Sequence, residues 1–171
     1  MKKITAAVLM ALMLVALTAC GAGDTTLGSA MVVSMSGANA TAEKAGSTTA
    51  NVTSCAVELD GDGKIVHVSW DVVQCKATVD AAGAVTVAES VTSKKELKEG
   101  YGMKGASSIG KEWYEQIAAL EEYAVGKTPA EVTGMKLTDK GAAGVEELAS
   151  SCTIGVGDFF KALTAAAANA K

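Results

Sequence analysis

The chain has 171 residues, of which 49% are hydrophobic but only 4% aromatic, and it carries 15 Lys, no Arg and 19 Asp plus Glu, a formal net charge of −4. This length suits one ordinary domain, and the apolar fraction excludes a disordered or collagen-like chain. An acidic chain without Arg lacks the basic face that neutralises phosphates, so the composition argues against nucleic-acid binding. We therefore expect one compact domain with a modest core.

Residues 1–20 have the order of a bacterial secretory signal. Lys2 and Lys3 precede an apolar run over residues 6–16, which closes on small residues and Cys20. The run is shorter than the roughly 20 apolar residues that a transmembrane helix needs, so a permanent span is not expected. The predicted divisions are a signal peptide, a tether and a single folded domain, at residues 1–19, 20–26 and 27–171.

The end of this signal, residues 17–20, resembles the lipobox of bacterial lipoproteins. The resemblance implies cleavage between Ala19 and Cys20, with diacylglycerol on the Cys20 sulfur and palmitate-like chains as a membrane anchor. The alternative is an ordinary signal peptide with an incidental cysteine. Cleavage would remove two lysines, and an anionic membrane repels the acidic product, so attachment would depend on the lipid. The expected location is the extracytoplasmic face of the cell membrane.

Strand patterns fill the first half of the folded domain. Residues 27–36 predict a first strand, and residues 37–47, rich in Ala, Gly and Asn, predict a long turn. Two β-branched runs, at 52–59 and 64–71, flank an Asp/Gly turn whose residues tolerate positive φ, which predicts a hairpin. A similar unit follows over residues 75–88. Together these units predict an antiparallel meander of four or five strands.

The second half changes to helical patterns after a charged, solvated stretch at residues 93–99. Apolar residues recur at helical spacing over residues 111–125, and Gly126 stands where a left-handed C-cap belongs. Thr128 begins a capping box that opens a short helix ending near Gly134. A last helix is expected over residues 154–168, with Phe159, Leu163 and Ala167 on one face. The predicted fold class is α+β, an antiparallel meander sheet followed by packed helices.

Three motifs have an ordinary structural explanation beside a functional one. Residues 100–105 match G-x-G-x-x-G, but they follow a charged run where a dinucleotide site needs a βαβ unit, so a loop is favoured. The D-x-D-G sequence at residues 60–63 lacks the further oxygen ligands of a calcium loop, so a hairpin turn is favoured. His67 is the single histidine and has no evident metal-binding partners, so we interpret it as a strand residue. No catalytic or metal-binding residues are assigned.

Three cysteines remain after Cys20. Outside the cytoplasm two of them could pair, and Cys55 and Cys75 form the candidate disulfide because they lie on nearby predicted strands, leaving Cys152 odd. Three free thiols in an anaerobic habitat are the alternative. The absence of C-x-x-C argues against thiol redox work.

The segment before the last helix carries hydroxyl and glycine residues over positions 150–158. Such a segment could present an anion site at a helix N-terminus, which would suit phosphate. The alternative is plain N-capping by Thr153. Aromatic residues of the preceding helix could stack on a planar cofactor, although their spacing also fits core and rim positions: Trp113, Tyr114 and Tyr123.

Taken together, these motifs resemble a family of bacterial lipoproteins, mostly of Gram-positive anaerobes, with a domain similar to the small FMN-binding domain. The likeness covers nearly the whole mature chain. It rests on the hairpin at 60–65 and on the motifs at 94–97, 101–104, 107–116, 125–128 and 153–158.

The resemblance implies a flavin site before the terminal helix. In FMN-binding domains a segment like S-G-A-T ends in a Thr that can carry FMN through a phosphoester, attached by a separate flavin transferase. The matching positions place Thr153 as acceptor after Ser150 and Ser151, with Gly155 and Gly157 permitting close approach of the backbone. The sequence departs from the motif at Ser151, Cys152 and Gly155, which weighs against covalent attachment. Counter-charge would come from Lys104 or Lys111, and Trp113 or Tyr114 would cover the ring.

The implied function is a membrane-anchored flavin-binding lipoprotein that transfers electrons among membrane redox partners. The alternative is a non-catalytic surface lipoprotein, a binding module or antigen, that keeps the fold without flavin. A third possibility, that the cleaved signal peptide acts as a signalling peptide, is left open by residues 1–19.

Overall fold

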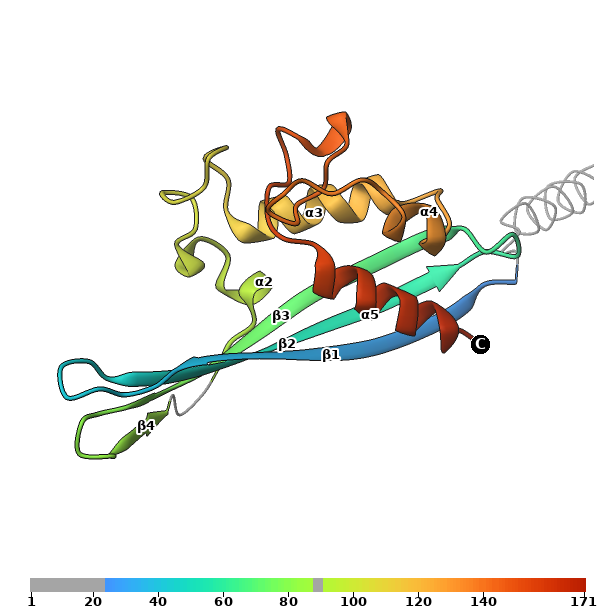
Figure 1. Cartoon of the computed structure of the whole chain (residues 1–171). Helices are drawn as coiled ribbons and strands as arrows, with labels where there is room; N and C mark the ends of the chain where they lie inside the picture. The colour runs from blue at the N-terminus through green and yellow to red at the C-terminus, as the bar shows by residue number, and fades with distance from the viewer. Residues whose placement is uncertain (1–23, 88–90) are drawn as a thin grey trace, which may run out of the picture.

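The computed structural model describes residues 24–87 and 91–171. The predicted signal peptide, Cys20 and most of the tether lie outside the described residues. Figure 1 shows a long antiparallel sheet with helices on one face. The sheet has four strands in the order β1-β2-β3-β4, so the predicted meander and the α+β class are confirmed.

The bounds of the elements follow the chain in two blocks. The strands are β1 (Thr26–Ala38), β2 (Gly46–Leu59), β3 (Ile65–Val79) and β4 (Val85–Val87). The helical elements are α2 (Lys94–Leu97), η1 (Lys98–Tyr101), α3 (Trp113–Ala124), α4 (Pro129–Thr133), η2 (Glu146–Leu148) and α5 (Gly157–Ala168).

The strands are longer than the sequence predicts. β1 runs to Ala38 and β2 begins at Gly46, so the long turn predicted for 37–47 is shorter at both ends. β3 is one strand where two were expected, because residues 72–74 are Val-Val-Gln and contain no turn former. Asp60 makes the predicted hairpin turn by accepting the N–H groups of Asp62 and Lys64 at 3.0 and 2.9 Å.

The helix ends follow their capping signals. Thr128 and Glu131 form the predicted capping box, and Gly126 has φ 79 after α3. The charged stretch at 93–99 forms α2 and the start of η1, and residues 96–99 are exposed, as expected of a solvated segment. Ser93 accepts the Glu96 N–H and Glu96 accepts the Ser93 N–H, which is a second capping box.

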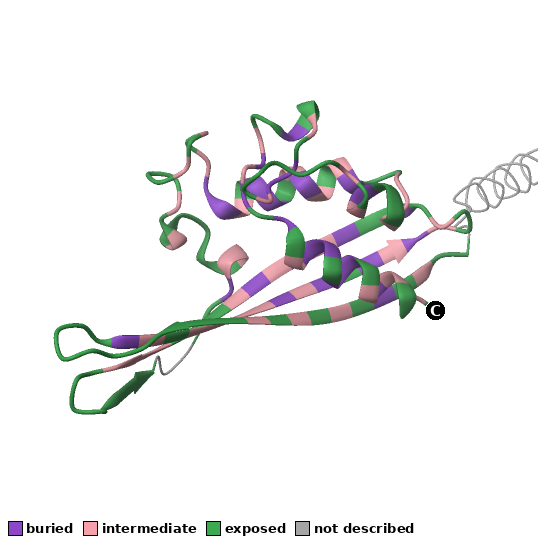
Figure 2. Ribbon diagram, viewed as in Figure 1, coloured by how far each residue is buried: buried purple, intermediate pink, exposed green. Residues whose placement is uncertain are grey.

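The core lies between the helices and one face of the sheet. α5 packs on β1 and β2, whereas α2 and α3 pack on β3. Trp70 is fully buried, and its indole N–H donates to the Phe159 carbonyl at 3.1 Å, which joins β3 to α5. Figure 2 shows the buried positions gathered in this layer, whereas the hairpin tips beyond it are exposed.

The Cys55–Cys75 pairing is wrong. Cys55 lies opposite Trp70 and Cys75 opposite Ala50, so the two are five positions apart along the sheet and, because side chains alternate, on opposite faces. Because a strand rises about 3.4 Å per residue, five positions put the two Cα atoms much farther apart than the roughly 7 Å that a disulfide can span. Cys55, Cys75 and Cys152 are all free, as the alternative expected. Burial raises the pKa of Cys55 to about 12 and also raises the pKa of Cys152.

Candidate functional site

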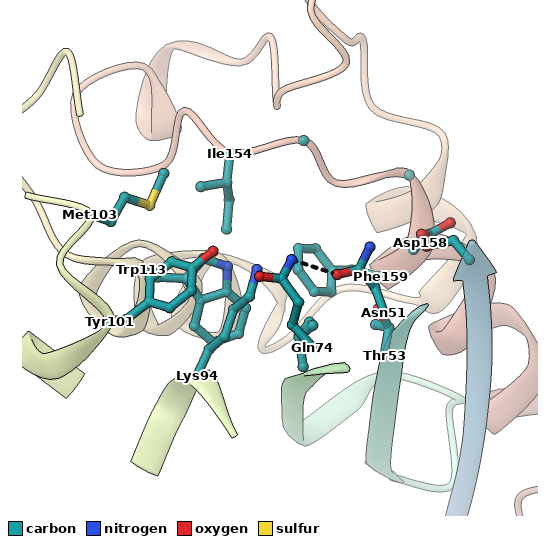
Figure 3. A pocket seen from close by; sticks show the side chains of 14 residues that line it. Asn51, Thr53, Gln74, Lys94, Tyr101, Met103, Trp113, Ile154, Asp158 and Phe159 are labelled. Atoms are coloured by element: carbon teal, nitrogen blue, oxygen red, sulfur yellow. Dashed lines mark hydrogen bonds between the residues drawn. The ribbon is translucent and has the colours of Figure 1, made fainter. Parts of the chain in front are cut away.

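A cavity of about 530 Å³, called here the sheet pocket, opens between the inner sheet face and the start of α5 (Figure 3). Its volume falls within the range of small-molecule sites. β1, β2 and β3 supply the floor, the α2–η1 region and the first residue of α3 supply one wall, and residues 154–159 supply the other. Three parts of the chain that are distant in sequence therefore meet around one space.

The floor of the sheet pocket carries a pair of amides. Asn51 on β2 lies directly opposite Gln74 on β3, and Gln74 Nε2 donates to Asn51 Oδ1 at 2.8 Å (Figure 3). This bond leaves the Gln74 carbonyl oxygen and the Asn51 amide protons available, because each amide has two donors and a two-lone-pair acceptor. The floor thus offers an acceptor and donors side by side.

One wall is aromatic and cationic. Trp113 and Tyr101 line it together, and Lys94 Nζ lies 4.7 Å from the Tyr101 ring centroid and 5.5 Å from that of Trp113. A cation over ring faces is attracted by their quadrupoles, and no carboxylate within residues 24–87 and 91–171 forms an ion pair with Lys94. Among the residues that line this pocket, Lys94 is the one lysine.

The other wall is the start of α5. Val156 is the N-cap and no side chain caps the helix, so the N-capping role considered for Thr153 is wrong: α5 begins three residues later than the predicted 154. The first N–H groups of α5 remain available to an anion. Asp158 already stands in this turn, and hydrogen bonds from Lys161 and Ser34 lower the pKa of its carboxyl. The carboxylate therefore opposes a phosphate here.

Thr153 faces a different cavity. This loop cavity, about 900 Å³, is lined by Cys152, Thr153 and the loops at 103–108 and 138–149. The Thr153 hydroxyl and backbone N–H both donate to Gln116 Oε1, at 3.2 and 2.9 Å. Gln116 is fully buried and its amide also donates to Ser107 Oγ and the Lys111 carbonyl, so it fixes Thr153 to the loop before α3.

The glycine-rich motif at 100–105 begins in the last two residues of η1 and continues as a loop, the interpretation favoured over a dinucleotide site. The buried Glu112 carboxylate accepts the N–H groups of Met103 and Lys104, at 2.8 and 3.0 Å. A carboxylate of the protein thus occupies two of the backbone donors that a diphosphate would use.

The structure does not bring the predicted site residues together: four line one cavity or the other, and the others line neither. Trp113, Gly155 and Gly157 line the sheet pocket, and Thr153 lines the loop cavity. Ser150 and Lys104 are exposed outside both, and Ser151 Oγ donates to the Glu147 carbonyl. Tyr114 donates its hydroxyl to Glu99 at 2.8 Å and lines neither cavity. Tyr101 stands beside Trp113 in the place expected for Tyr114.

Sequence reasoning missed several residues of the site. Asn51 faces Gln74 only because the β2–β3 register shifts by one residue between Glu58 and Leu59. The register at the 60–63 turn alone would place Asn51 opposite Val73, so the sequence did not reveal this amide pair. Lys94 follows the Ser93 cap, which would have located it at a helix start. The role of Gln116 has no sequence signal, because its partners lie in the loop before α3 and, 37 positions along the chain, at Thr153.

Within residues 24–87 and 91–171, no helix has the length and apolarity to cross a membrane. In the same ranges, no group of three or more His, Cys, Asp or Glu side chains could hold a metal ion.

Comparisons with known proteins give a partial likeness. No protein-family profile matches the chain, and no solved structure matches it. A protein named chlorophenol reductase, from Desulfitobacterium hafniense, is 37% identical over 95 residues, which cover 48% of this chain and 29% of that protein. The chain thus spans less than a third of that relative's length. It is a distant, partial homologue of a protein named as a reductase.

Proposed function

We propose that this chain is a redox protein that binds a flavin, FMN, in the sheet pocket and passes electrons between membrane partners. One observation carries the proposal: a cavity of suitable size joins two aromatic rings, a lysine and an exposed amide pair. The partial likeness to a protein named chlorophenol reductase supports a redox role.

The residues present fit the ring system of a flavin. Tyr101 and Trp113 offer faces for stacking. Asn51 and Gln74 offer the adjacent donors and acceptor that a ring edge of alternating carbonyls and N–H groups requires. A bound flavin would supply the electron chemistry, and the protein would position it and set its electrostatics.

For the phosphate of FMN, the start of α5 offers an open backbone but also an opposing carboxylate, Asp158. Gly155 and Gly157 leave the backbone open, with nothing within 4 Å of a Cβ placed at Gly157. Because Asp158 opposes an anion there, Lys94 is the counter-charge within the pocket. The Lys104 expected for this role lies outside it.

Titration of the full chain with FMN and with riboflavin tests the proposal through flavin fluorescence. Saturable binding of FMN that is tighter than that of riboflavin supports a site that recognises the phosphate. Equal binding of the two would place only the ring in the pocket, and absence of binding by either would overturn the proposal for the unmodified chain.

Lys94→Met tests the location. Losing a charge-assisted contact to the phosphate should weaken FMN binding by roughly tenfold or more. Lys98→Met is the matched control, since Lys98 is a nearby exposed lysine that does not line the pocket. Equal effects of the two changes would indicate a general charge effect and place the flavin elsewhere.

Covalent attachment at Thr153 is a separate question, because this hydroxyl faces the loop cavity and is bonded to Gln116. Intact mass of the chain produced with a flavin transferase, compared with Thr153→Ala, answers it. A mass increase of one FMN that disappears in Thr153→Ala would assign the flavin to the loop cavity.

The alternative function is a non-catalytic surface lipoprotein, a binding module or antigen that keeps the fold without flavin. The observation that favours it is the carboxylate of Asp158 at the start of α5, together with the engagement of Thr153 by Gln116. Failure of both flavin experiments would leave this alternative.

Attachment to the extracytoplasmic face of the membrane through lipid on Cys20 is also part of the proposal, on the sequence of residues 17–20. Acyl labelling and membrane fractionation of Cys20→Ala test it. Labelling should be lost and the protein left uncleaved or unacylated. Unchanged labelling and fractionation would refute the anchor.

A further inference from the structure

Within the part of the chain that the structure describes, the outer edge of β1, on the side away from β2, is hydrogen-bonded only at its beginning. At its beginning, Leu27 exchanges backbone hydrogen bonds with Lys171 at 3.2 Å on the side away from β2. Bonding directions alternate along a strand, so every second residue after Leu27 also directs its N–H and C=O to this side. Beyond Asn169, which donates to the Ser29 carbonyl, no residue in the described ranges bonds this edge from Met31 to Met35.

β1 also lacks the usual protection of an edge strand. Natural edges are guarded by charges, prolines or bulges. The sequence has no charged residue and no proline between Asp24 and Glu43, and β1 pairs with β2 without a register shift. The side chains of Met31, Val33 and Met35 point to the open face of the sheet and are 73%, 60% and 73% exposed.

We propose that this edge pairs with the β1 edge of a second copy of the chain, in antiparallel fashion, to give one continuous sheet. The chain has a net charge of −4, so two copies repel each other through their acidic surfaces. β1 is a long strand without a charged residue, so contact through β1 brings few like charges together. A two-fold axis requires a self-complementary edge, and β1 meets this requirement.

The register follows from the side-chain pattern. With the axis at Val33, this residue lies opposite its own copy and Met31 lies opposite Met35, so the apolar row continues across the junction. All three residues direct their backbone groups to the edge, as a hydrogen-bonded pair requires. Asp158, close to this part of β1 through Ser34, is paired with Lys161 at 3.0 Å, so each copy brings an ion pair to the junction instead of an isolated charge.

Val33→Lys tests the pairing, with Val66→Lys as the matched control. Val66 is 45% exposed on β3, at the end of the sheet where Leu59 pairs with Thr26 and Ile65, so both variants add one lysine at an exposed valine of the sheet. Sedimentation equilibrium of the full chain in density-matched detergent should show a dimer. Val33→Lys should weaken it by roughly 100-fold, whereas Val66→Lys should change the dissociation constant by less than about threefold.

Amide hydrogen exchange provides the second measurement. The N–H groups of Met31, Val33 and Met35 should be protected at high protein concentration and exchange faster on dilution and in Val33→Lys. Circular dichroism melts confirm that both variants fold. A wild-type chain that is monomeric to about 100 μM, or a dimer lost equally in both variants, would overturn the proposal. Association that survives Val33→Lys, with these amides unprotected, would assign the contact to another surface.

Discussion

The two long edges of the sheet are treated in opposite ways. On the β3 edge, the backbone N–H of Trp70 donates to Glu121 Oε1 at 2.7 Å. The backbone of Ile65 forms hydrogen bonds with the Gly126 N–H and the Lys127 carbonyl, both at 2.8 Å. On the β1 edge, such partners are confined to the end near Ser29, where the C-terminal residues lie. α3 therefore completes β3 within the chain, whereas β1 is left with an edge that another strand can complete.

The cover of β3 is itself supported by charge. Lys95 Nζ donates to Glu121 Oε1 at 2.6 Å and to Ser69 Oγ at 2.9 Å, with both charged side chains partly buried. The two edges therefore differ in chemistry as well as in packing: the side chains of Lys95 and Glu121 close the β3 edge, whereas β1 itself carries no charged residue.

Gly28→Ala should have the largest effect, because it separates β1 from α5. A Cβ at Gly28 would lie 2.0 Å from the Ala166 carbonyl oxygen, a backbone atom that cannot rotate away. Overpacking of this kind costs about 3 kcal/mol, which urea unfolding would detect as a lower midpoint. Ser29→Ala is the control, because Ser29 is exposed. A change below about 0.5 kcal/mol for Gly28→Ala would show that α5 is not held closely to β1.

Glu121→Ala should have the next largest effect, because it uncovers β3. The Trp70 N–H would lose its acceptor and Lys95 its partner, and we expect a loss of about 1–3 kcal/mol in the free energy of unfolding. Glu121→Gln keeps an acceptor and should recover part of this loss. Glu122→Ala, at an exposed neighbour, is the control. If Glu121→Ala and Glu122→Ala were equally mild, the side-chain cover would not stabilise the β3 edge.

Much of the fold was predictable because its signals are local. The Asp60 turn, the Thr128 capping box and Gly126 each act within a few residues, and the structure has all three. The Asp/Gly turn at 80–83 was also predicted and ends β3, but the continuity of this strand through residues 72–74 was missed. The disulfide was missed because proximity of strands says nothing about which face each cysteine takes.

The site was predictable only in part. Gly155 and Gly157 were found because they stand at the start of the last helix, and Trp113 was found as an aromatic residue of the preceding helical pattern. Thr153 was placed in the same site by sequence proximity, but the chain reverses sides between residues 153 and 154, so the two positions line different cavities. Lys94 comes from the stretch at 93–99 that was expected to be solvated, and Tyr101 from the motif at 100–105 that was expected to be a loop. Their approach to the pocket depends on tertiary packing.

Asp158→Asn should have the smallest effect and tests how the start of α5 is fastened to β1. Hydrogen bonds from Lys161 and Ser34 lower the pKa of the Asp158 carboxyl, so its stabilisation is complete above the unfolded value near 3.8 and is lost as the pH falls through the lower folded value. For a partly exposed pair we expect about 0.3 kcal/mol. In urea unfolding from pH 6 to 2, wild type should lose slightly more free energy of unfolding than Asp158→Asn, because the variant has no carboxyl to protonate. If the free energy of unfolding depended on pH identically in wild type and Asp158→Asn, this end of α5 would be held to β1 by packing alone. The contact between α5 and β1 would then differ from the β3 edge, where charged side chains contribute.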